Sequence, residues 1–299
     1  MNTTSKYKIS IVTPTYNRGG LLTKAYKSLL NQTNINFEWI IIDDGSNDNT
    51  GDIVSSFISN DKFKIIYVYQ SNGGKHRAIN KALEYTSGDY MLILDSDDYL
   101  DETAIQKLEE WTETIDDNLE FAGVSGNKAY FNGDIVGQTL KGNLYYKDCT
   151  NIERKKFNLL GDKAEVYRTS IIKTYKFPTF ENENFITEEI LWDKIASMGY
   201  KIRWFNETIY FCEYLDDGLT KSGDDKFINN FYGYASNVKQ KIKLYDFVTK
   251  LKYLSNYTRI RKIKKLTHKE AIKIVDAPKG LYFLSLLFEF LKTIYRRMR

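Results

Sequence analysis

The chain has 299 residues, of which 42% are hydrophobic and 27% charged, so it can bury a full core as one large domain or one domain with an appendage. Its two cysteines, Cys149 and Cys212, lie far apart and outside any CxxC pattern, which argues against a disulfide scaffold or a zinc site. Since His76 and His268 are the only histidines, a histidine-rich metal site is excluded, and a bound cation must use oxygen ligands, as Mg²⁺ or Mn²⁺ does.

The net charge of +4 is unevenly distributed along the chain. Residues 239–299 hold 17 Lys and Arg against 4 Asp and Glu, a balance of +13, which leaves 26 against 35, or −9, for residues 1–238. This asymmetry favours an acidic body with one function and a basic tail that meets an anionic surface.

The beginning of the chain and its hydropathy bear on location. The first eight residues are polar and lead directly into an apolar, strand-like run, so we expect no signal peptide. Nowhere do 18 apolar residues run without a charge, so we expect no membrane-spanning helix. Both patterns predict a cytoplasmic protein.

Strand and helix patterns alternate over the first 115 residues. Short apolar, β-branched runs predict buried strands at residues 9–13, 39–43, 64–69 and 90–94. Apolar side chains at helical spacing predict helices after each of them, around residues 21–30, 53–58, 78–83 and 104–112. The alternation predicts an α/β fold with a mixed, mostly parallel central sheet and helices on both faces.

Beyond residue 119 the alternation weakens. We expect strands at residues 121–125, 128–131, 201–205 and 208–212, and a helix at 187–198. The stretch 216–225 places glycine and serine among charges, which indicates a mobile loop and a domain boundary. The predicted organisation is one domain at 1–222, divided near residue 118, and a helical basic tail at 223–299.

Polar or glycine-rich clusters follow all four of the early predicted strands. In an open α/β sheet, ligands bind outside the carboxyl ends of the strands. Each cluster alone is typical of a turn, but the four together predict a ligand site at that edge. The clusters are Pro14-Thr15-Tyr16-Asn17-Arg18, Asp43-Asp44-Gly45-Ser46, Asn72-Gly73-Gly74-Lys75-His76-Arg77 and Asp95-Ser96-Asp97-Asp98.

The DxD pattern Asp95-Ser96-Asp97 has the spacing of a cation site. Residues i and i+2 of an extended segment point the same way, so both carboxylates can face one ion. A hard divalent ion held by two carboxylates keeps positions for phosphate oxygens and neutralises charge on a diphosphate leaving group. The alternative is a capped turn before a helix at Thr103, for which Asp98 and Asp101 are suitable residues.

Two other clusters carry charges suited to a nucleotide. The side chains of Asp43 and Asp44 diverge at a strand end, so one can accept a hydrogen bond from a nucleobase while the other holds the turn. Lys75 and Arg77, beside two glycines and just before a predicted helix, suit a phosphate, with solvated surface charges as the alternative. No GxGxxG follows the first strand, so Rossmann dinucleotide binding is disfavoured.

Together these segments resemble the donor-binding half of family 2 glycosyltransferases, which share the glycosyltransferase A-type fold. The resemblance continues more loosely to about residue 221. It is carried by the runs Ile11-Val12-Thr13-Pro14-Thr15-Tyr16-Asn17, Trp39-Ile40-Ile41-Ile42-Asp43-Asp44-Gly45-Ser46-Asn47-Asp48-Asn49-Thr50, Asn72-Gly73-Gly74-Lys75 with Ala78 and Asn80, and Asp95-Ser96-Asp97-Asp98.

The resemblance implies roles for these residues and for the two halves of the domain. Residues 1–118 would be the donor half and 119–222 the acceptor half of a catalytic domain. Acceptor contacts would come from residues 130–165, including Asp162, and the loop 216–221 would be a lid over the donor. Pro14, Thr15, Tyr16 and Asp44 would line the base and ribose pocket, Lys75 and Arg77 the diphosphate site, and Asp95, Ser96 and Asp97 the Mn²⁺ or Mg²⁺ and diphosphate signature.

The family also places an acidic catalytic base near the start of a late helix. Many members have an aspartate there, whereas this chain has Glu188 and Glu189 after Thr187, a suitable N-cap. The spacing to Trp192 favours Glu188, and capping of the first helical turn is the alternative reading for both glutamates. As the base, Glu188 would accept the proton of an acceptor hydroxyl in an inverting displacement from a nucleotide diphosphate sugar, expected to be UDP-linked.

The tail ends in a stripe of apolar residues at helical spacing, with cationic residues at its C-terminal end. Such a helix is too short to span a bilayer but suits the interface at the inner face of the plasma membrane, while packing on protein or in a dimer explains it equally well. By resemblance, membrane contact would fit a lipid-linked acceptor in cell-surface polysaccharide synthesis. The stripe contains Leu281, Leu284, Leu287, Phe288, Leu291, Ile294 and Tyr295, and the cations gathered at its end are Lys292, Arg296, Arg297 and Arg299.

Three other functions are compatible with parts of the sequence. The basic run 259–265 could indicate nucleic-acid binding, but the acidic body argues against it, and we expect no nucleic-acid partner. A nucleotidyltransferase would need a richer glycine and basic loop after the first strand. A non-catalytic nucleotide-sugar binding or scaffold protein is disfavoured because Asp95, Asp97 and Glu188 are all present.

Overall fold

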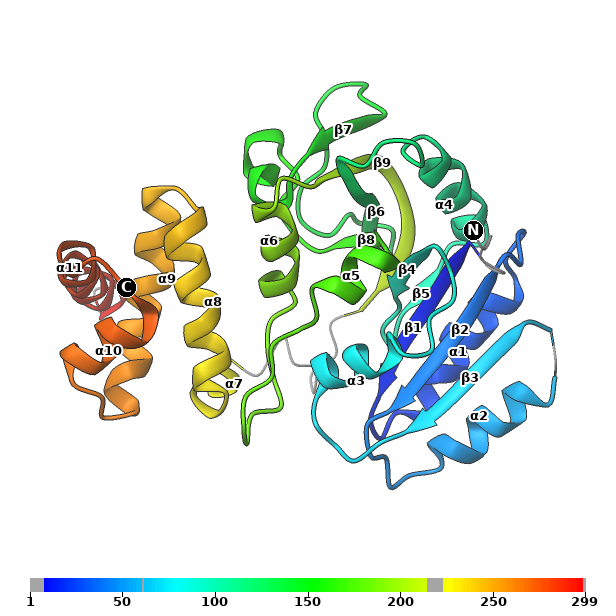
Figure 1. Cartoon of the computed structure of the whole chain (residues 1–299), viewed down its shortest axis with the longest axis horizontal. Helices are drawn as coiled ribbons and strands as arrows, with labels where there is room; N and C mark the ends of the chain where they lie inside the picture. Colours follow the sequence, from blue (N-terminus) through cyan, green and yellow to red (C-terminus); the bar gives the residue numbers. More distant parts are fainter. Residues whose placement is uncertain (1–7, 61, 214–222, 298–299) are drawn as a thin grey trace. The chain divides into compact units, whose positions relative to one another are not determined.

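The computed structural model describes residues 8–60, 62–213 and 223–297. It contains two compact units, each described here by itself: residues 1–177 with 194–214, and residues 178–193 with 215–299 (Figure 1). The loop 216–221, for which the sequence predicts a lid, and the boundary predicted at residue 222 lie outside the described residues.

The first unit is built on a mixed sheet, nine-stranded over the described residues, in the order β3-β2-β1-β4-β8-β6-β9-β5, with β7 paired to β9. Its three longest ladders, β1 with β2, β2 with β3 and β6 with β9, are parallel. The strands are β1 (Ile9–Thr15), β2 (Phe37–Asp43), β3 (Lys64–Tyr69), β4 (Tyr90–Ile93), β5 (Tyr99–Leu100), β6 (Phe121–Tyr130), β7 (Tyr146–Cys149), β8 (Lys163–Arg168) and β9 (Lys201–Cys212).

Helices cover both faces of this sheet, as the sequence predicts. Because parallel crossovers are right-handed, moving outward from β1 to β3 places α1 and α2 on one face, and returning past β1 to β4 places α3 on the other (Figure 1). Coverage on both sides explains why β1 and β2 are buried along their whole length. The helices are α1 (Gly19–Leu30), α2 (Thr50–Ile58), α3 (Lys75–Ala82), α4 (Ala104–Glu113), the 3₁₀ helix η1 (Asn151–Phe157) and α5 (Thr169–Thr174).

The strand register determines where the site can form. Thr15 of β1 lies opposite Asp43 of β2, which in turn lies opposite Tyr69 of β3. The three strands therefore end level with one another, and the loops that follow them leave from the same edge of the sheet. This is the edge at which the sequence analysis placed a ligand.

Two pairs of predicted strands are single strands in the structure. Residues 121–125 and all but the last residue of 128–131 belong to β6, which ends at Tyr130, and residues 201–205 and 208–212 belong to β9. The ladder between β6 and β9 has register shifts near Ser125, Asn127 and Lys128, and such irregularities interrupt the alternation of side chains that defines a strand in a sequence. Lys75 and Arg77 lie in the first turn of α3 rather than before a helix.

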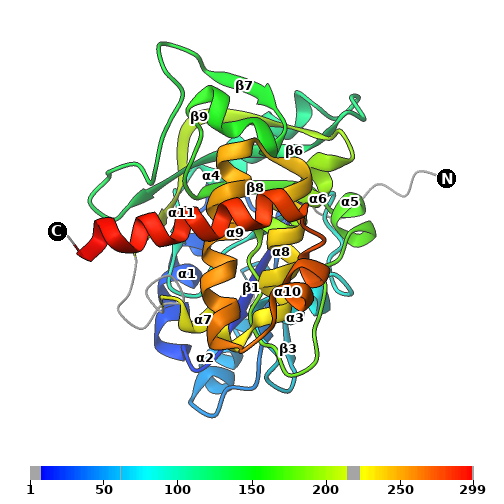
Figure 2. The ribbon, with the colours of Figure 1, turned by 90° about the vertical axis from the view of Figure 1, so that its left-hand side faces the viewer.

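The second unit is helical and has its own core. Residues 178–193 contribute the start of α6, and the tail supplies the remaining helices, which confirms a helical C-terminal region. Apolar and aromatic side chains from α8, α9, α10 and α11 form the core, and α11 lies across α9 (Figure 2). The helices are α6 (Glu189–Ser197), α7 (Asp225–Asn229), α8 (Phe231–Leu244), α9 (Phe247–Ile263), α10 (His268–Val275) and α11 (Lys279–Arg297). Over the described residues, no helix has the length and apolar character needed to cross a bilayer.

Candidate active site

The buried carboxylate of Asp44, just after β2, holds the glycine loop that precedes α3. It accepts hydrogen bonds from Gln70 Nε2 at 2.6 Å, from the Gly73 amide at 3.0 Å and from the Gly74 amide at 2.7 Å. Gly74 has φ of +92°, a conformation that glycine adopts without strain. Because a carboxylate has about four acceptor positions, the loop uses most but not all of the capacity of Asp44.

Asp43 holds the turn after β2, one of the two roles the sequence offered for this pair. Its Oδ1 accepts the Ser46 amide at 2.7 Å and its Oδ2 accepts the Tyr67 hydroxyl at 2.6 Å. Burial and the hydrogen bond to Asp43 raise the pKa of Tyr67 above its usual range, so the phenol remains a donor to the carboxylate.

The two DxD carboxylates face cations from two other loops. Lys75 Nζ lies 2.6 Å from Asp95 Oδ1, and Arg18 Nη1 lies 2.6 Å from Asp97 Oδ2. Burial pushes the pKa of Asp95 upward, but the charges of Lys75, Lys128 and Arg18 outweigh it, and the net pKa is lower than usual. Asp95 is therefore ionised at neutral pH.

All four clusters thus meet at one edge of the sheet. Arg18 follows β1, Asp44 follows β2, Lys75 follows β3, and Asp95 and Asp97 follow β4, and each is connected to another cluster by a contact given above. The loops after β1 and β2 are also joined directly, because the Asn17 amide donates to Ser46 Oγ at 2.8 Å. The structure brings the predicted donor residues together.

The remaining predicted donor residues line the same edge. Pro14 and Thr15 are the last two residues of β1, and Tyr16 follows them with an exposed ring. The buried Thr15 hydroxyl has no hydrogen-bond partner among the described residues, as expected of a group that a ligand would satisfy. Ser96 is buried between the two aspartates. Arg77 packs over Gly73, where an added Cβ would lie 2.6 Å from the arginine Cδ.

The sequence analysis missed a tyrosine and a lysine beside the DxD segment, Tyr210 and Lys128. The Tyr210 hydroxyl donates to Asp98 Oδ2 at 2.7 Å and accepts the Asp95 amide at 3.0 Å, while Lys128 Nζ lies 4.1 Å from the centre of the Tyr210 ring. Burial, together with the charge of Asp95, raises the pKa of Asp98 to about 7. Neither Tyr210 nor Lys128 belongs to a motif, so nothing in the sequence indicates them.

The capped-turn alternative for these aspartates holds at one position only. Asp101 Oδ1 accepts the Thr103 amide at 3.1 Å and thus caps the turn before α4. Asp98 instead binds Tyr210 in the interior. Arg18 was also missed as a site residue, although its position directly after the Pro-Thr-Tyr-Asn run was a usable signal.

The donor set of Asp95 and Asp97 fits a hard divalent cation. Both carboxylates already face positive charge, and oxygen ligands are those that Mg²⁺ and Mn²⁺ prefer. The described residues hold no group of three or more His, Cys, Asp or Glu side chains able to bind a metal. A cation here would therefore be held by two carboxylates, with its remaining positions filled by phosphate oxygens and water.

The two candidate bases stand at the start of α6, in the second unit. The helix begins at Glu189, with the Glu188 carbonyl accepting the Leu191 amide at 3.0 Å. The Glu189 carboxylate lies 3.0 Å from Lys241 Nζ and accepts the Tyr253 hydroxyl at 3.1 Å. Glu189 thus has contacts within the second unit, and the choice of Glu188 as the base stays a prediction.

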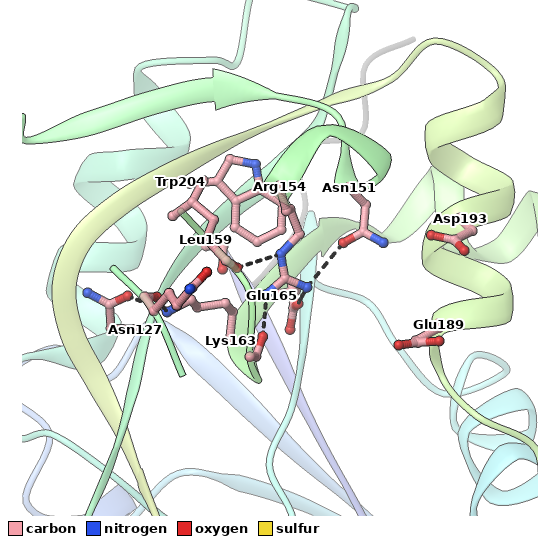
Figure 3. A network of polar contacts seen from close by, with 12 residues as sticks. Asn127, Asn151, Arg154, Leu159, Lys163, Glu165, Glu189, Asp193 and Trp204 are labelled. Carbon is pink, nitrogen blue, oxygen red and sulfur yellow. Dashed lines mark hydrogen bonds and ion pairs between the residues drawn. The ribbon is translucent and has the colours of Figure 1, made fainter. Parts of the chain in front are cut away.

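The segment between β7 and β8, where acceptor contacts were expected, is organised by Arg154. Its guanidinium donates to the carbonyl of Leu159 at 3.0 Å and to Asn151 Oδ1 at 3.4 Å, and stacks 4.8 Å from the Trp204 ring (Figure 3). Nearby Lys163 is buried and donates to Asn127 and to a backbone carbonyl; burial, aided by Arg154, lowers its pKa to about 8. Asp162 is exposed at the start of β8, and its acceptor role stays a prediction.

Fold and site together define a glycosyltransferase A-type protein. Residues 10–175 match the model of the family described as glycosyl transferase family 2. This match covers more than half of the chain, and the protein therefore belongs to glycosyltransferase family 2.

Known proteins similar to this chain are glycosyltransferases. Glycosyltransferase GlyA of Streptococcus pneumoniae is 25% identical over 237 residues, covering 74% of this chain and 33% of that protein. A GalNAc(5)-diNAcBac-PP-undecaprenol beta-1,3-glucosyltransferase of Campylobacter jejuni is 31% identical over 191 residues, covering 62% of this chain and 58% of that protein. The chain therefore spans only part of the length of these relatives.

Solved structures confirm the fold. Residues 1–349 of S. aureus TarS in complex with UDP-GlcNAc match with a TM-score of 0.62 and 19% identity, over 93% of this chain and 79% of that one. A mannosyltransferase of Pyrobaculum calidifontis in complex with GDP-Man and Mn²⁺ matches with a TM-score of 0.54 and 14% identity, over 99% of this chain and 84% of that one.

Proposed function

We propose that this protein is an inverting glycosyltransferase that moves a sugar from a nucleotide diphosphate sugar, UDP-linked, to a hydroxyl of a glycan or lipid-linked acceptor in cell-surface polysaccharide synthesis. The observation that carries the proposal is the meeting of Arg18, Asp44, Lys75, Asp95 and Asp97 at one sheet edge. The UDP-GlcNAc complex of TarS and the undecaprenol-linked substrate in the name of the Campylobacter enzyme support the choice of donor and acceptor class.

The donor would bind along the edge formed by the four loops. Pro14, Thr15, Tyr16 and Asp44 would line the base and ribose, and the Thr15 hydroxyl, which has no partner within the described ranges, would be available to the ligand. The side chains of Lys75 and Arg77, in the first turn of α3, would hold the diphosphate, because cations and amides at a helix start favour phosphate. A Mn²⁺ or Mg²⁺ ion held by Asp95 and Asp97, across Ser96, would neutralise charge on the leaving diphosphate.

Glu188 would act as the general base. It would accept the proton of the acceptor hydroxyl as that oxygen forms a bond to the anomeric carbon and the bond from that carbon to the diphosphate breaks. A single displacement of this kind inverts the configuration at the anomeric carbon.

A donor screen tests the proposal. The purified protein is incubated with a panel of nucleotide sugars and Mn²⁺, and melting temperature and release of nucleoside diphosphate are measured. We expect one donor to raise the melting temperature by mass action and to release diphosphate. Asp97→Asn should lower the release rate on the order of 10²–10³-fold, because charge stabilisation of the leaving group is lost, whereas Asp52→Asn, on the exposed surface of α2, should leave it unchanged.

The screen also separates the alternatives. A protein that binds no nucleotide sugar contradicts the proposal altogether. Binding without diphosphate release, unchanged by addition of lipid-linked acceptors, supports a non-catalytic nucleotide-sugar binding protein instead.

We further propose that α11 lies on the inner face of the plasma membrane, because its exposed face is apolar although Tyr282 already packs into the core. Its inward face holds Ser285 and Glu289, both buried, with Glu289 bound by Ser255, Arg259 and Lys292. In a water-exposed helix the apolar face is the one that packs inward. The exposed large apolar side chains of α11, over the described residues, are Phe283, Leu284, Leu287, Phe290, Leu291, Ile294 and Tyr295.

Charge favours an anionic bilayer as the occupant of this face. Residues 239–299 carry a balance of +13, so two copies of this region would repel each other, whereas anionic headgroups attract it. An apolar helix face flanked by cations and lying in the interface has this character. The proposal places the protein in the cytoplasm as a peripheral membrane protein.

Vesicle sedimentation tests the membrane contact. We expect the protein to bind phosphatidylcholine vesicles that contain phosphatidylglycerol more strongly than vesicles of phosphatidylcholine alone. Leu287→Asp/Phe290→Asp should abolish this binding, and Leu119→Asp, which changes an exposed leucine of the first unit, should not. Absence of binding to anionic vesicles, or a dimer in light scattering that the double variant dissociates, would overturn it.

A further inference from the structure

A buried lysine of the helical unit forms ion pairs with two carboxylates of α6. Lys241 of α8 has a side chain only 4% exposed, and its Nζ lies 2.7 Å from Asp193 Oδ2 and 3.0 Å from Glu189 Oε2. Two tyrosines bind the same carboxylates: the Tyr245 hydroxyl donates to Asp193 at 2.7 Å and the Tyr253 hydroxyl donates to Glu189 at 3.1 Å. Both carboxylates of one helix face are thus bound by α8 and α9.

The arrangement follows from helical spacing. Glu189 and Asp193 are four residues apart, so their side chains lie on the same face of α6, where two like charges repel each other. A single cation between them offsets this repulsion. Because Asp193 is fully buried, Lys241 also compensates a charge that would otherwise be left in the interior.

A second set of contacts, made by Glu183 and Asn230, holds the chain just before Glu188. The buried carboxylate of Glu183 accepts the amides of Tyr232 and Gly233 in the first turn of α8, each at 2.7 Å. Asn230 Oδ1 accepts the amides of Asn184 and Phe185 at 2.8 and 2.9 Å. These bonds satisfy amides at the start of α8 and fix the segment at residues 183–185.

Glu188 lies between these two sets of contacts along the chain. The Glu188 carbonyl accepts the Leu191 amide at 3.0 Å and the Trp192 amide at 3.3 Å, so fixing the face that carries Glu189 and Asp193 also holds the backbone of the residue before the helix. The contacts of Glu183 lie five residues upstream of Glu188, and those of Lys241 begin one residue downstream, at Glu189. The backbone on both sides of this glutamate is therefore held by contacts of its neighbours along the chain.

We propose that Lys241 is a positioning residue for the catalytic base: through Glu189 and Asp193 it fixes the rotation of α6 and hence the direction of Glu188. The inference rests on the base role proposed above for Glu188. It assigns the helical unit a part in the chemical step, separate from any contact with a membrane. An error of about 1 Å in the position of a reacting group can cost on the order of 10²-fold in rate.

The test uses the full chain and separates positioning from folding. We expect Lys241→Met to lower kcat for sugar transfer on the order of 10²-fold while the Kd for the nucleotide sugar changes less than about twofold, as expected when no donor contact is lost. Tyr253→Phe, which removes only the hydroxyl bound to Glu189, should shift kcat in the same direction by less. Lys239→Met is the matched control, because Lys239 lies on the same helix, has a side chain 42% exposed compared with 4% for Lys241, and lies 3.7 Å from Asp276.

A double-mutant cycle gives the readout that a merely structural role would not move. If Lys241 acts through Glu188, then Lys241→Met should cost almost nothing further in the Glu188→Gln background, because the base it positions is gone. Additive losses would overturn the proposal, as would a kcat for both Lys241→Met and Tyr253→Phe within about twofold of wild type, a change too small for a displaced base. Full turnover by Glu188→Gln alone would show instead that the proposed base is wrong, so the two failures are distinguishable.

Should Lys241→Met fail to fold, Tyr253→Phe provides the same comparison alone. Its hydrogen bond is partly exposed and its ring stays in place, so a change in kcat with an unchanged melting temperature reports positioning. An unchanged kcat in this variant, measured on folded protein, would then count against the proposal.

Discussion

The two units use their ion pairs in opposite ways. In the first unit, the apolar core is continuous and the charged pairs Arg18–Asp97 and Lys75–Asp95 lie partly exposed at the sheet edge. In the second unit, Lys241 and Asp193 are buried in the interior, and Glu289 is buried under α11. Exposed pairs can exchange partners when a ligand arrives, whereas buried pairs cannot be opened without large cost. The first unit thus has ion pairs that can change partners when a ligand binds, and the second unit has ion pairs that keep one arrangement.

The largest effect should come from removing the proposed base. Glu188→Gln keeps the size and the backbone contacts of the residue but cannot accept a proton. We expect kcat for sugar transfer to fall about 10²–10⁴-fold, with the nucleotide-sugar Kd unchanged, in steady-state and binding assays. Glu181→Gln, an exposed glutamate of the same segment, is the control. Near-normal turnover in the Glu188 variant would show that the base lies elsewhere.

An intermediate effect should come from opening a fixed contact of the second unit. Glu183→Ala removes the carboxylate that accepts the first amides of α8, and loss of a helix cap of this kind costs about 0.5–2 kcal/mol. Urea unfolding measures this loss. A free energy of unfolding unchanged within error would indicate that water replaces the carboxylate, and the second unit would then be less rigid than its buried charges imply.

The smallest effect should come from an exchangeable pair of the first unit. Arg18→Met frees Asp97 from a cation that competes with a divalent ion for the same carboxylate. Partly exposed pairs of this kind are worth about 0.2–1 kcal/mol, so we expect the Mn²⁺ Kd in the absence of nucleotide to fall by roughly 1.4- to 5-fold. Isothermal titration measures it. A weaker Mn²⁺ affinity in this variant would mean that Arg18 orients Asp97 toward the ion instead of competing with it.

The part of the site that the sequence predicts is the part built from local patterns. Hydrophobic runs locate the four early strands, and parallel pairing brings the ends of the strands to one edge, so Asp44, Lys75, Asp95 and Asp97 could be expected to meet. The roles of Pro14, Thr15, Tyr16 and Arg77 toward a donor, and of Glu188, stay predictions. The glycine loop explains why Asp44 is buried: its carboxylate serves the backbone of Gly73 and Gly74.

Contacts between distant parts of the chain could not be predicted in this way. Tyr210 reaches Asp98 from a strand 112 residues later, and ordinary strand residues such as Lys128 carry no motif to mark them. The tail showed an apolar stripe, but periodicity alone does not say which face packs inward. Only the buried Ser285 and Glu289 show that the stripe of α11 faces out.

The attachment of residues 178–193 to the helical unit limits how this protein can be recombined. The sequence places that segment well before the C-terminal helices, yet Glu183, Glu189 and Asp193 take their partners from α8 and α9. A chimaera that exchanges only the C-terminal helices between relatives would leave three acidic side chains facing foreign neighbours. An exchange between relatives therefore has to include both residues 178–193 and the C-terminal helices. For the same reason, natural sequence changes at Lys241 should accompany changes at Asp193.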